Sequence, residues 1–442
     1  MSDVSNGKEG TAPRGPGQGE DADERSGLLQ LAILSLLAGA VTGLVVALYR
    51  LCLDRADHFR HVLVDWAHQW SILGLVLVSA ACALATAVAA WMVRRLSPHA
   101  TGGGIPHVEK VLSGKLPPAP ISLAPVKFIG GVLASASGLA LGPEGPSVQM
   151  GACLAHLVGI AFRRNWRDCK ALLAAGAGAG LAAAFNAPIA GAIFVLEELV
   201  RRFDTRTAVA ALGASAAAIS VSRLLLGNVP DFTVDPLAFA PPHRTAALFL
   251  ALGVVAGFLA VVYNRTLLGT LAVANRLTRW HVELKAGLIG ATVGVLAWFL
   301  PDLVGGGHDV TQGTLAGEAV LTYLPLVFLL RFGLGPVSYA ARTPGGLFAP
   351  MFVPGAQLGL LFGILCRLVF PELGVQPVAY AVVGMAAFLT GVVRAPVTAI
   401  ALVIEMTASF AMLLPMLAAC FTAMLVPTLL GNPPIYDSLR TR

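Results

Sequence analysis

Three ionisable residues, Lys127, Glu144 and Glu198, stand in or beside long apolar stretches of this 442-residue chain. A charged side chain in such a stretch is costly, and in membrane proteins it marks an ion pathway or a proton relay. A lysine supplies positive potential, and a glutamate can take up and release a proton. We therefore expect the chemistry of this protein, the movement of an ion or a proton, to lie at these three residues.

Three glycine-rich turns each place a proline near the expected start of a helix. They cover residues 102–106 (Gly-Gly-Gly-Ile-Pro), 142–146 (Gly-Pro-Glu-Gly-Pro) and 345–350 (Gly-Gly-Leu-Phe-Ala-Pro). Proline fits the first turn of a helix, and glycine lets the backbone approach a ligand closely. The first N–H groups of a helix are unpaired and carry the positive end of its dipole, so several such ends together favour an anion over a cation. Taken singly, each turn could equally be a tight connection between helices.

The elements that must position these residues cross a bilayer. The chain is 56% hydrophobic and only 12% charged, and several uncharged stretches reach the ~20 residues that a spanning helix needs. The net charge of +6 comes from Lys and Arg that flank these stretches, a pattern that sets topology and favours anionic lipid. No basic segment alternates with aromatic residues, so we expect no nucleic-acid partner.

The organisation along the chain is simple. Residues 1–26 are rich in Gly, Pro and acidic residues and are typical of a disordered cytoplasmic tail. Residues 27–436 form one membrane domain, and residues 437–442 form a short C-terminal tail. Gly and Pro interrupt many apolar segments, and non-helical backbone at membrane depth survives only where it is buried in protein or lines a cavity. The breaks therefore predict discontinuous helices around a transport site.

An internal repeat relates two halves of the membrane domain, roughly 27–227 and 244–436. Its matched positions are Gly142 and Gly346, Pro146 and Pro350, Gly151 and Gly355, Gly159 and Gly363, Pro188 and Pro396, and Glu197 and Glu405. Twofold repeats with broken helices are typical of secondary transporters and related channels, which place their site where the repeats meet.

Motifs of hydrolases and metalloenzymes are missing from the sequence, including HExxH, a Walker-type loop and GxSxG. The six cysteines are scattered and form no CxxC pair, as small core residues do. We expect no enzyme activity, no metal and no cofactor, which disfavours a membrane enzyme such as an intramembrane hydrolase.

These motifs resemble those of the CLC family of chloride channels and chloride/proton antiporters over essentially residues 27–436. The three turns are similar to the family's GSGIP, GREGP and GxFxP, in the family's order. Residues 185–188 (Phe-Asn-Ala-Pro), followed by Glu197 and Glu198, resemble the segment with the internal proton glutamate, and Tyr436 falls where the family has its pore tyrosine. The resemblance implies an all-α CLC-like fold of two inverted-topology repeats with broken helices, a prokaryotic type without CBS domains, and a homodimer with one pathway per subunit.

The resemblance also implies roles for single residues. Ionised Glu144 occupies an anion position and closes the outer pathway; when protonated it leaves, admits chloride and carries a proton. Glu198 matches the inner proton-transfer residue. The implied anion-binding residues are Gly103, Ile105, Gly145, Leu347, Phe348 and Tyr436, with Lys127 adding positive potential.

Each charged residue also has a plainer alternative. Glu144 could be a first-turn glutamate that stabilises the helix dipole. Glu197 and Glu198 could form a solvated helix end, paired with the arginines four residues later. Lys127 could extend to the membrane interface.

Two positions depart from the family pattern. Gly103 stands where chloride-selective members usually have Ser, so one hydroxyl ligand is lost and the choice between chloride and nitrate stays open. Pro143 replaces the Arg of GREGP, which removes a cation and a backbone donor near the outer mouth. We expect a weaker outer anion site as a result.

Glutamates at both Glu144 and Glu198 favour coupled chloride/proton antiport, because coupling requires an ionisable residue at each end of a proton route. An uncoupled, voltage- or pH-gated anion channel of the same family is the alternative. We expect chloride and protons as substrates, a lipid bilayer as surroundings, a homodimer, and a location in a bacterial inner membrane.

Overall fold

The computed structural model describes residues 18–234, 243–277, 279–317 and 322–441. Within these ranges every regular element is a helix, apart from two isolated backbone bridges that join Gly102 to Pro344 and Gly142 to Gly346. The predicted all-α architecture is confirmed.

The order of helices in the first half recurs in the second. The first half holds α1 (Gln18–Ala67), α2 (Ser71–Leu96), α3 (Ile105–Leu112), α4 (Leu123–Ala136), α5 (Glu144–Ala161), α6 (Trp166–Phe185), α7 (Pro188–Phe194) and α8 (Thr205–Leu226). The second half holds α9 (Ala246–Arg276), α10 (Val282–Phe299), α11 (His308–Leu315), α12 (Leu324–Tyr339), α13 (Phe348–Val369), α14 (Pro377–Val393), α15 (Pro396–Thr407) and α16 (Leu413–Leu429), followed by α17 (Ile435–Arg440). A π-helical turn at Val195–Leu199 follows α7, and short 3-10 turns lie at His68–Trp70, Pro98–Ala100, His243–Thr245, Pro301–Leu303, Pro371–Leu373 and Phe410–Met412.

The chain is a multi-pass integral membrane protein. Seven helical segments of its described part are long and apolar enough to cross a bilayer: Gly27–Leu96, Trp166–Phe185, Thr205–Leu226, Ala246–Arg276, Val282–Phe299, Phe348–Val369 and Phe410–Leu429. Other helices are too short to cross, among them α3 and α11 with 8 residues each, since a spanning helix needs ~20 residues. The predicted broken helices are therefore present.

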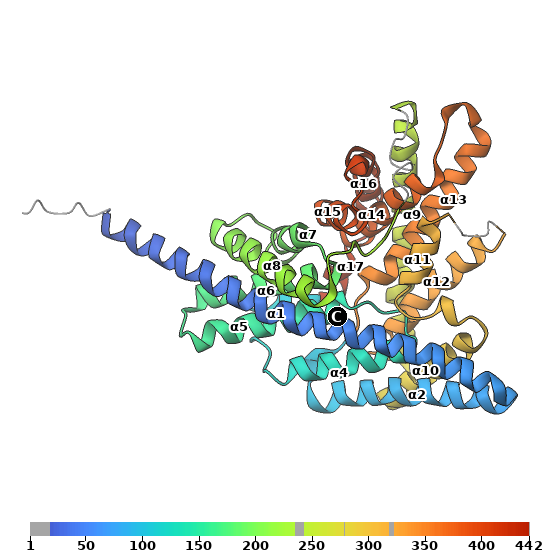
Figure 1. The fold of residues 1–442 in the computed structure, drawn as a ribbon, viewed down its shortest axis with the longest axis horizontal. Coiled ribbons are helices and arrows are strands. Elements are labelled where there is room, and N and C mark those ends of the chain that lie inside the picture. The colour runs from blue at the N-terminus through green and yellow to red at the C-terminus, as the bar shows by residue number, and fades with distance from the viewer. Residues whose placement is uncertain (1–17, 235–242, 278, 318–321, 442) are drawn as a thin grey trace, which may run out of the picture.

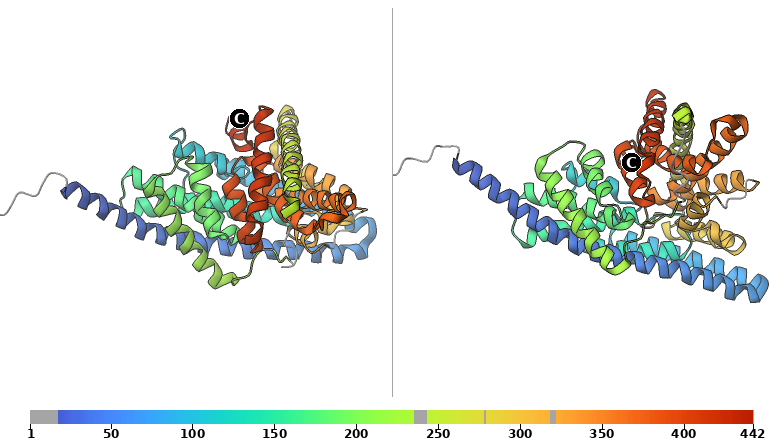
Figure 2. Two further views of the ribbon diagram at one scale, coloured as in Figure 1. Left: turned by 90° about the horizontal axis from the view of Figure 1, so that it is seen from above. Right: turned by 45° about the horizontal axis from the view of Figure 1, so that its top comes forward.

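The long helix α1 runs obliquely across the molecule in Figure 1, and it contacts α8, α6, α5, α4 and α2. Figure 2 shows its length from two further sides. It begins at Gln18, so the prediction of a disordered tail up to residue 26 is wrong for its last part. The prolines that would stop a helix, Pro13 and Pro16, both precede Gln18. Residues 1–17 of the predicted tail lie outside the described residues.

The other predicted tail, residues 437–442, also differs from the structure. Helix α17 continues to Arg440 because Asp437 is held from both sides, 2.9 Å from a guanidinium nitrogen of Arg201 and 3.1 Å from one of Arg440. Residue 442 lies outside the described residues.

Two glutamates at matched positions of the repeat bind the opposite half. The Glu197 carboxylate accepts hydrogen bonds from the backbone N–H groups of Val397 (3.0 Å) and Thr398 (2.7 Å), in the first turn of α15. The Glu405 carboxylate accepts them from Ile189 (3.1 Å) and Ala190 (2.8 Å), in the first turn of α7. Each carboxylate thereby satisfies helix N–H groups that would lack a partner. The segment that follows α7 therefore lies against the start of α15, and the end of α15 lies against the start of α7. The two helices run antiparallel, as inverted repeats require.

The repeated glycines let neighbouring helices touch at the backbone. A Cβ atom at Gly151 of α5 would lie 2.2 Å from the carbonyl oxygen of Gly176 in α6. A Cβ atom at Gly355 of α13 would lie 2.9 Å from the carbonyl oxygen of Gly384 in α14. Small residues of this kind permit the close helix packing on which membrane proteins depend, here of α5 on α6 and of α13 on α14.

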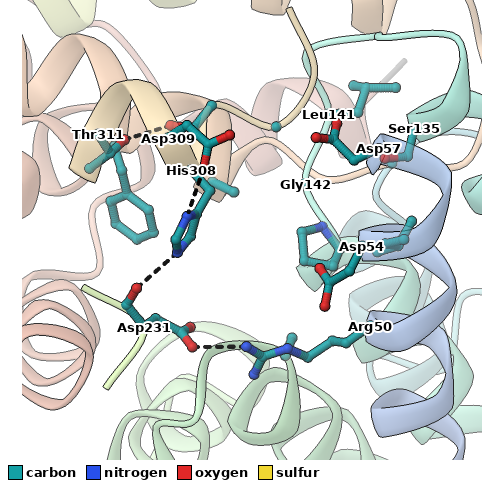
Figure 3. A pocket seen from close by; sticks show the side chains of 18 of the residues that line it. Arg50, Asp54, Asp57, Ser135, Leu141, Gly142, Asp231, His308, Asp309 and Thr311 are labelled. Carbon is teal, nitrogen blue, oxygen red and sulfur yellow. Dashed lines mark hydrogen bonds and ion pairs between the residues drawn. The ribbon is translucent and has the colours of Figure 1, made fainter. Parts of the chain in front are cut away.

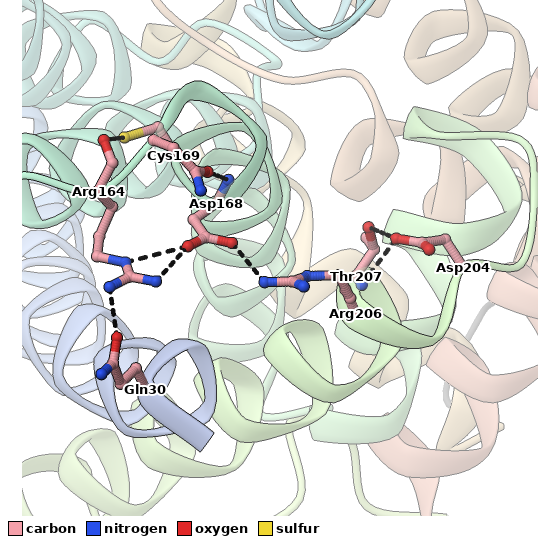
Figure 4. A network of polar contacts seen from close by, with 8 residues as sticks. Gln30, Arg164, Asp168, Cys169, Asp204, Arg206 and Thr207 are labelled. Carbon is pink, nitrogen blue, oxygen red and sulfur yellow. Dashed lines mark hydrogen bonds and ion pairs between the residues drawn. The ribbon is translucent and has the colours of Figure 1, made fainter. Parts of the chain in front are cut away.

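A buried aspartate joins the end of α5 to α6, α8 and α1 (Figure 4). Asp168 lies 2.6 Å from Arg164 and 2.8 Å from Arg206, and its own side chain is fully buried. Arg164 continues the network to Gln30 of α1. A buried carboxylate needs paired charges of this kind, and the pairing holds the outer helices of the first half around α5.

Candidate functional site

The three glycine-rich turns meet in the middle of the molecule. The turn at 345–350 lies between the other two: the Gly345 N–H donates to the carbonyl of Gly102 (3.2 Å), and the Gly346 N–H donates to the carbonyl of Gly142 (2.8 Å). The Gly142 N–H donates back to the carbonyl of Gly346 (3.0 Å). Because α3, α5 and α13 begin directly after these turns, three helix N-termini converge, as the sequence predicts.

The convergence depends on glycine. A Cβ atom at Gly145 would lie 2.5 Å from the Cα atom of Gly103 and 2.9 Å from that of Gly346. Contacts this short are not tolerated, so any side chain at Gly145 would push the turns apart. Gly103 and Gly145, both predicted anion-binding residues, are thus backbone neighbours, and Ile105 is buried two residues beyond Gly103 as the first residue of α3.

Glu144 occupies the centre of this arrangement. It is the first residue of α5, with a fractional exposure of 0%. Its Oε1 atom accepts a hydrogen bond of 2.6 Å from the backbone N–H of Phe348, the first residue of α13, and Leu347 precedes it as the buried N-cap. Its Oε2 atom is buried without a hydrogen-bond partner among the described residues. The carboxylate of one helix start therefore sits on the N-terminus of another, where an anion is favoured.

Tyr436 lies next to the same helix start. Its ring centroid is 5.9 Å from that of Phe348, and the residue is 1% exposed. Its hydroxyl is buried and has no hydrogen-bond partner within the described ranges. Since buried hydroxyl groups are normally paired, this one is available to a ligand.

Lys127 of α4 does not extend to the interface. It is completely buried, and its Nζ atom donates a hydrogen bond to the carbonyl of Gly102. The interface alternative is wrong because the carbonyl of Gly102, the first residue of the turn, provides a partner inside the protein. The lysine thereby holds the turn and places its amino group beside it.

Glu198 lies in a separate cluster on the π-helical turn after α7. It is 3% exposed and lies 3.3 Å from a guanidinium nitrogen of Arg201, which also contacts Asp437 (2.9 Å) and Glu109 of α3 (3.6 Å). The predicted pairs four residues apart are wrong. Glu198 pairs with the residue three positions later, and Glu197 turns to α15.

Glu109 is a buried carboxyl that the sequence motifs do not single out. The available signal is its place on the buried face of α3, in helical spacing with Ile105, Val108 and Leu112. Glu109 and Glu198 lie outside the candidate membrane spans, and burial raises the pKa of both carboxyls. Each carboxyl therefore holds a proton more readily than a solvated glutamate does.

Two cavities approach these two groups of residues. One, of about 470 Å³, is lined by Arg50, Asp231 and His308 and reaches Gly142 and Pro143, directly before Glu144 (Figure 3). The other, of about 570 Å³, is lined by Glu198, Arg201 and Arg394, among others. The two cavities share no lining residue.

Comparison with known proteins identifies the family. The model of the voltage gated chloride channel family matches residues 85–428. The H(+)/Cl(-) exchange transporters ClcA of Vibrio cholerae serotype O1 (strain M66-2) and of Cronobacter sakazakii are each 36% identical to this chain, over 92% and 94% of it and 88% and 90% of their own lengths. The chain belongs to the CLC family.

Solved CLC structures agree in fold. The structure of a slow cyanobacterial Cl-/H+ antiporter has a TM-score of 0.89 and 30% identity and covers 93% of this chain and 97% of its own. A CLC-type fluoride/proton antiporter has a TM-score of 0.77 and covers 92% and 97%; at 22% identity this likeness concerns the fold alone. The predicted CLC-like fold is confirmed.

Of the two departures from the CLC pattern, Pro143 lines the cavity of about 470 Å³. The guanidinium groups that line this cavity come from α1 instead of position 143: Arg50 pairs with Asp231 at 2.8 Å, and Arg60 pairs with Asp57 at 2.6 Å. The sequence motifs do not indicate these arginines, because they lie on a helix distant from the turns in sequence.

We predict that Gly145→Ala destabilises the protein by about 3 kcal/mol, because its methyl group would overpack the three turns. Thermal unfolding in detergent measures the effect. Gly269→Ala in α9 is the matched control, since a Cβ atom there meets nothing within 4 Å and alanine is the better helix former. Equal unfolding midpoints for the two variants would show that the turns do not depend on close backbone contact.

Proposed function

We propose that this chain exchanges chloride for protons across the membrane, with Glu144 as the outer gate and Glu198 as the inner proton-transfer residue. The observation that carries the proposal is the 2.6 Å hydrogen bond from the Phe348 N–H to the Glu144 carboxylate. The Glu144 carboxyl group, which is negative when ionised and neutral when protonated, occupies an anion position at the N-terminus of α13. Proton binding and anion binding at this position are therefore mutually dependent.

The outer half of the cycle follows from that contact. Ionised Glu144 closes the path between the cavity at Gly142 and the turns. Protonation weakens its hold on the N–H of Phe348, because a charge-assisted hydrogen bond becomes a neutral one. Chloride then takes the vacated N–H of Phe348, together with the N–H of Leu347 and the hydroxyl of Tyr436.

The remaining predicted anion-binding residues act through backbone and charge. Gly103 lies two residues before α3, and Ile105 and Gly145 lie in the first turns of α3 and α5, the helices whose N-terminal dipole ends favour an anion. Lys127 adds a positive charge beneath the turn at Gly102. Once Glu144 has moved, a desolvated anion has helix dipoles on several sides and no ionised carboxylate beside it.

The inner half of the cycle needs a proton carrier with access to the second cavity, the one of about 570 Å³. Glu198 lines that cavity and is itself nearly buried. Burial raises the pKa of its carboxyl, which suits a group that must hold a proton away from bulk water and then release it. We also propose that the protein forms a homodimer with one pathway per subunit. We propose a bacterial inner membrane as its location, which its similarity to bacterial ClcA transporters supports.

We predict that Glu144→Gln abolishes proton transport and leaves chloride flux, because glutamine cannot exchange a proton or carry a charge. The measurement is proton uptake into proteoliposomes driven by a chloride gradient, with chloride efflux followed in parallel. Glu372→Gln, at an exposed position, is the control and should behave like the unmodified protein. Continued proton transport by Glu144→Gln would contradict the gate assignment, and a chloride flux without any proton movement in the unmodified protein would indicate a channel.

We predict that Glu198→Gln stops proton transport while chloride flux continues, since the inner proton carrier is lost and the anion path is unchanged. Its neighbour Glu197 provides the matched control: Glu197→Gln keeps an oxygen that can accept from the N–H groups of α15, so proton transport should persist. Proton uptake and chloride efflux, measured in parallel in proteoliposomes as above, distinguish the two variants. Loss of proton transport in Glu197→Gln and its retention in Glu198→Gln would reverse the assignment.

A further inference from the structure

Position 103 lacks a hydroxyl although the packing around it leaves room for one. A Cβ atom at Gly103 would lie 3.6 Å from the carbonyl oxygen of Gly345 and 3.9 Å from the Cα atom of Gly145, which are ordinary contacts. Crowding therefore does not account for glycine at this position. The first turn is left with backbone donors alone unless another residue supplies a hydroxyl.

Tyr339 brings a phenol group to this turn from the end of α12. The backbone N–H of Gly103 donates to its hydroxyl oxygen at 3.5 Å. The neighbouring Gly102 has a φ of +61°, and a Cβ atom there would lie 2.7 Å from the same hydroxyl oxygen. The Tyr339 hydroxyl thus lies directly over residues 102 and 103, in space that a side chain at Gly102 would close.

The hydrogen atom of this hydroxyl is available to a ligand. A phenol can donate one hydrogen bond and accept others. The structure gives the Tyr339 oxygen one donor, the Gly103 N–H, and among the described residues it gives the Tyr339 O–H no acceptor. The hydroxyl of Tyr436 is buried and has no hydrogen-bond partner among the described residues.

We propose that the Tyr339 hydroxyl is a ligand of the transported anion and supplies the hydroxyl donor that position 103 lacks. The proposal rests on the anion site proposed above and adds a residue to it. A small monovalent anion at the three turns receives two phenol donors, from Tyr339 beside α3 and from Tyr436 beside α13. A phenol is also more acidic than an aliphatic hydroxyl and so a stronger donor to a desolvated anion.

The role of Tyr339 is tested by chloride titration calorimetry on the purified protein in detergent. The titrations are done in the Glu144→Gln background, so that the carboxylate does not compete for the site. Adding Tyr339→Phe keeps the ring and removes only the hydroxyl, and we expect the Kd for chloride to rise roughly tenfold to a hundredfold, the usual value of one hydrogen bond to a charged group. Adding Gly103→Ser to Tyr339→Phe should recover a large part of the lost affinity, because serine restores a hydroxyl on the same turn.

The matched control is Tyr380→Phe, at a buried tyrosine that stacks on Phe249 with ring centroids 4.4 Å apart and packs against α13 near Gly359. Its Kd should not change. Unchanged chloride affinity in Tyr339→Phe, or a loss that Gly103→Ser does not recover while the unfolding midpoint is retained, would overturn the role of Tyr339. A parent protein that binds no chloride would instead overturn the proposed anion site itself, and with it this role.

Discussion

The rest of the structure depends on one interaction, the contact between a buried carboxylate and the start of another helix. Glu144 begins α5 and accepts a hydrogen bond from the first N–H of α13. Helix dipoles converging on one point repel each other unless a negative charge lies between them. Glu144 provides that charge from within the chain. In the proposed cycle the same need for a charge lets chloride replace the carboxylate, so that the feature that stabilises the closed state also provides the binding energy for transport.

Most of the surrounding structure brings the backbones of the three turns close enough together for this contact. Gly103, Gly145 and Gly346 remove side chains between the turns, and Lys127 secures the first turn from below. The reciprocal contacts of Glu197 and Glu405 tie the two halves together at the starts of α15 and α7. Carboxylates on helix N-termini thus serve two purposes in this fold. Those of Glu197 and Glu405 each accept two backbone N–H bonds, whereas the second oxygen of Glu144 has no hydrogen-bond partner in the part of the chain that the structure describes.

The sequence was sufficient to predict the convergence of the three turns, the membrane fold and the position of Glu144, because local motifs of Gly and Pro encode helix starts directly. It was not sufficient for contacts made by residues distant along the chain. Glu109, Asp437 and Tyr339 belong to no motif and reach the site through the packing of α3, α17 and α12. The π-helical turn after α7 redirects Glu197 and Glu198, which a regular helical spacing cannot foresee.

In the proposed cycle the Glu144 carboxylate and the transported anion compete for one place. Anomalous diffraction from crystals soaked in bromide tests this competition, with the unmodified protein and Glu144→Gln compared under the same conditions. We expect a carboxylate oxygen at the Phe348 N–H in the unmodified protein and a bromide peak at that N–H in the variant. A variant with no bromide there, or an unmodified protein that holds bromide at this N–H while Glu144 remains in contact with it, would show that the two do not compete.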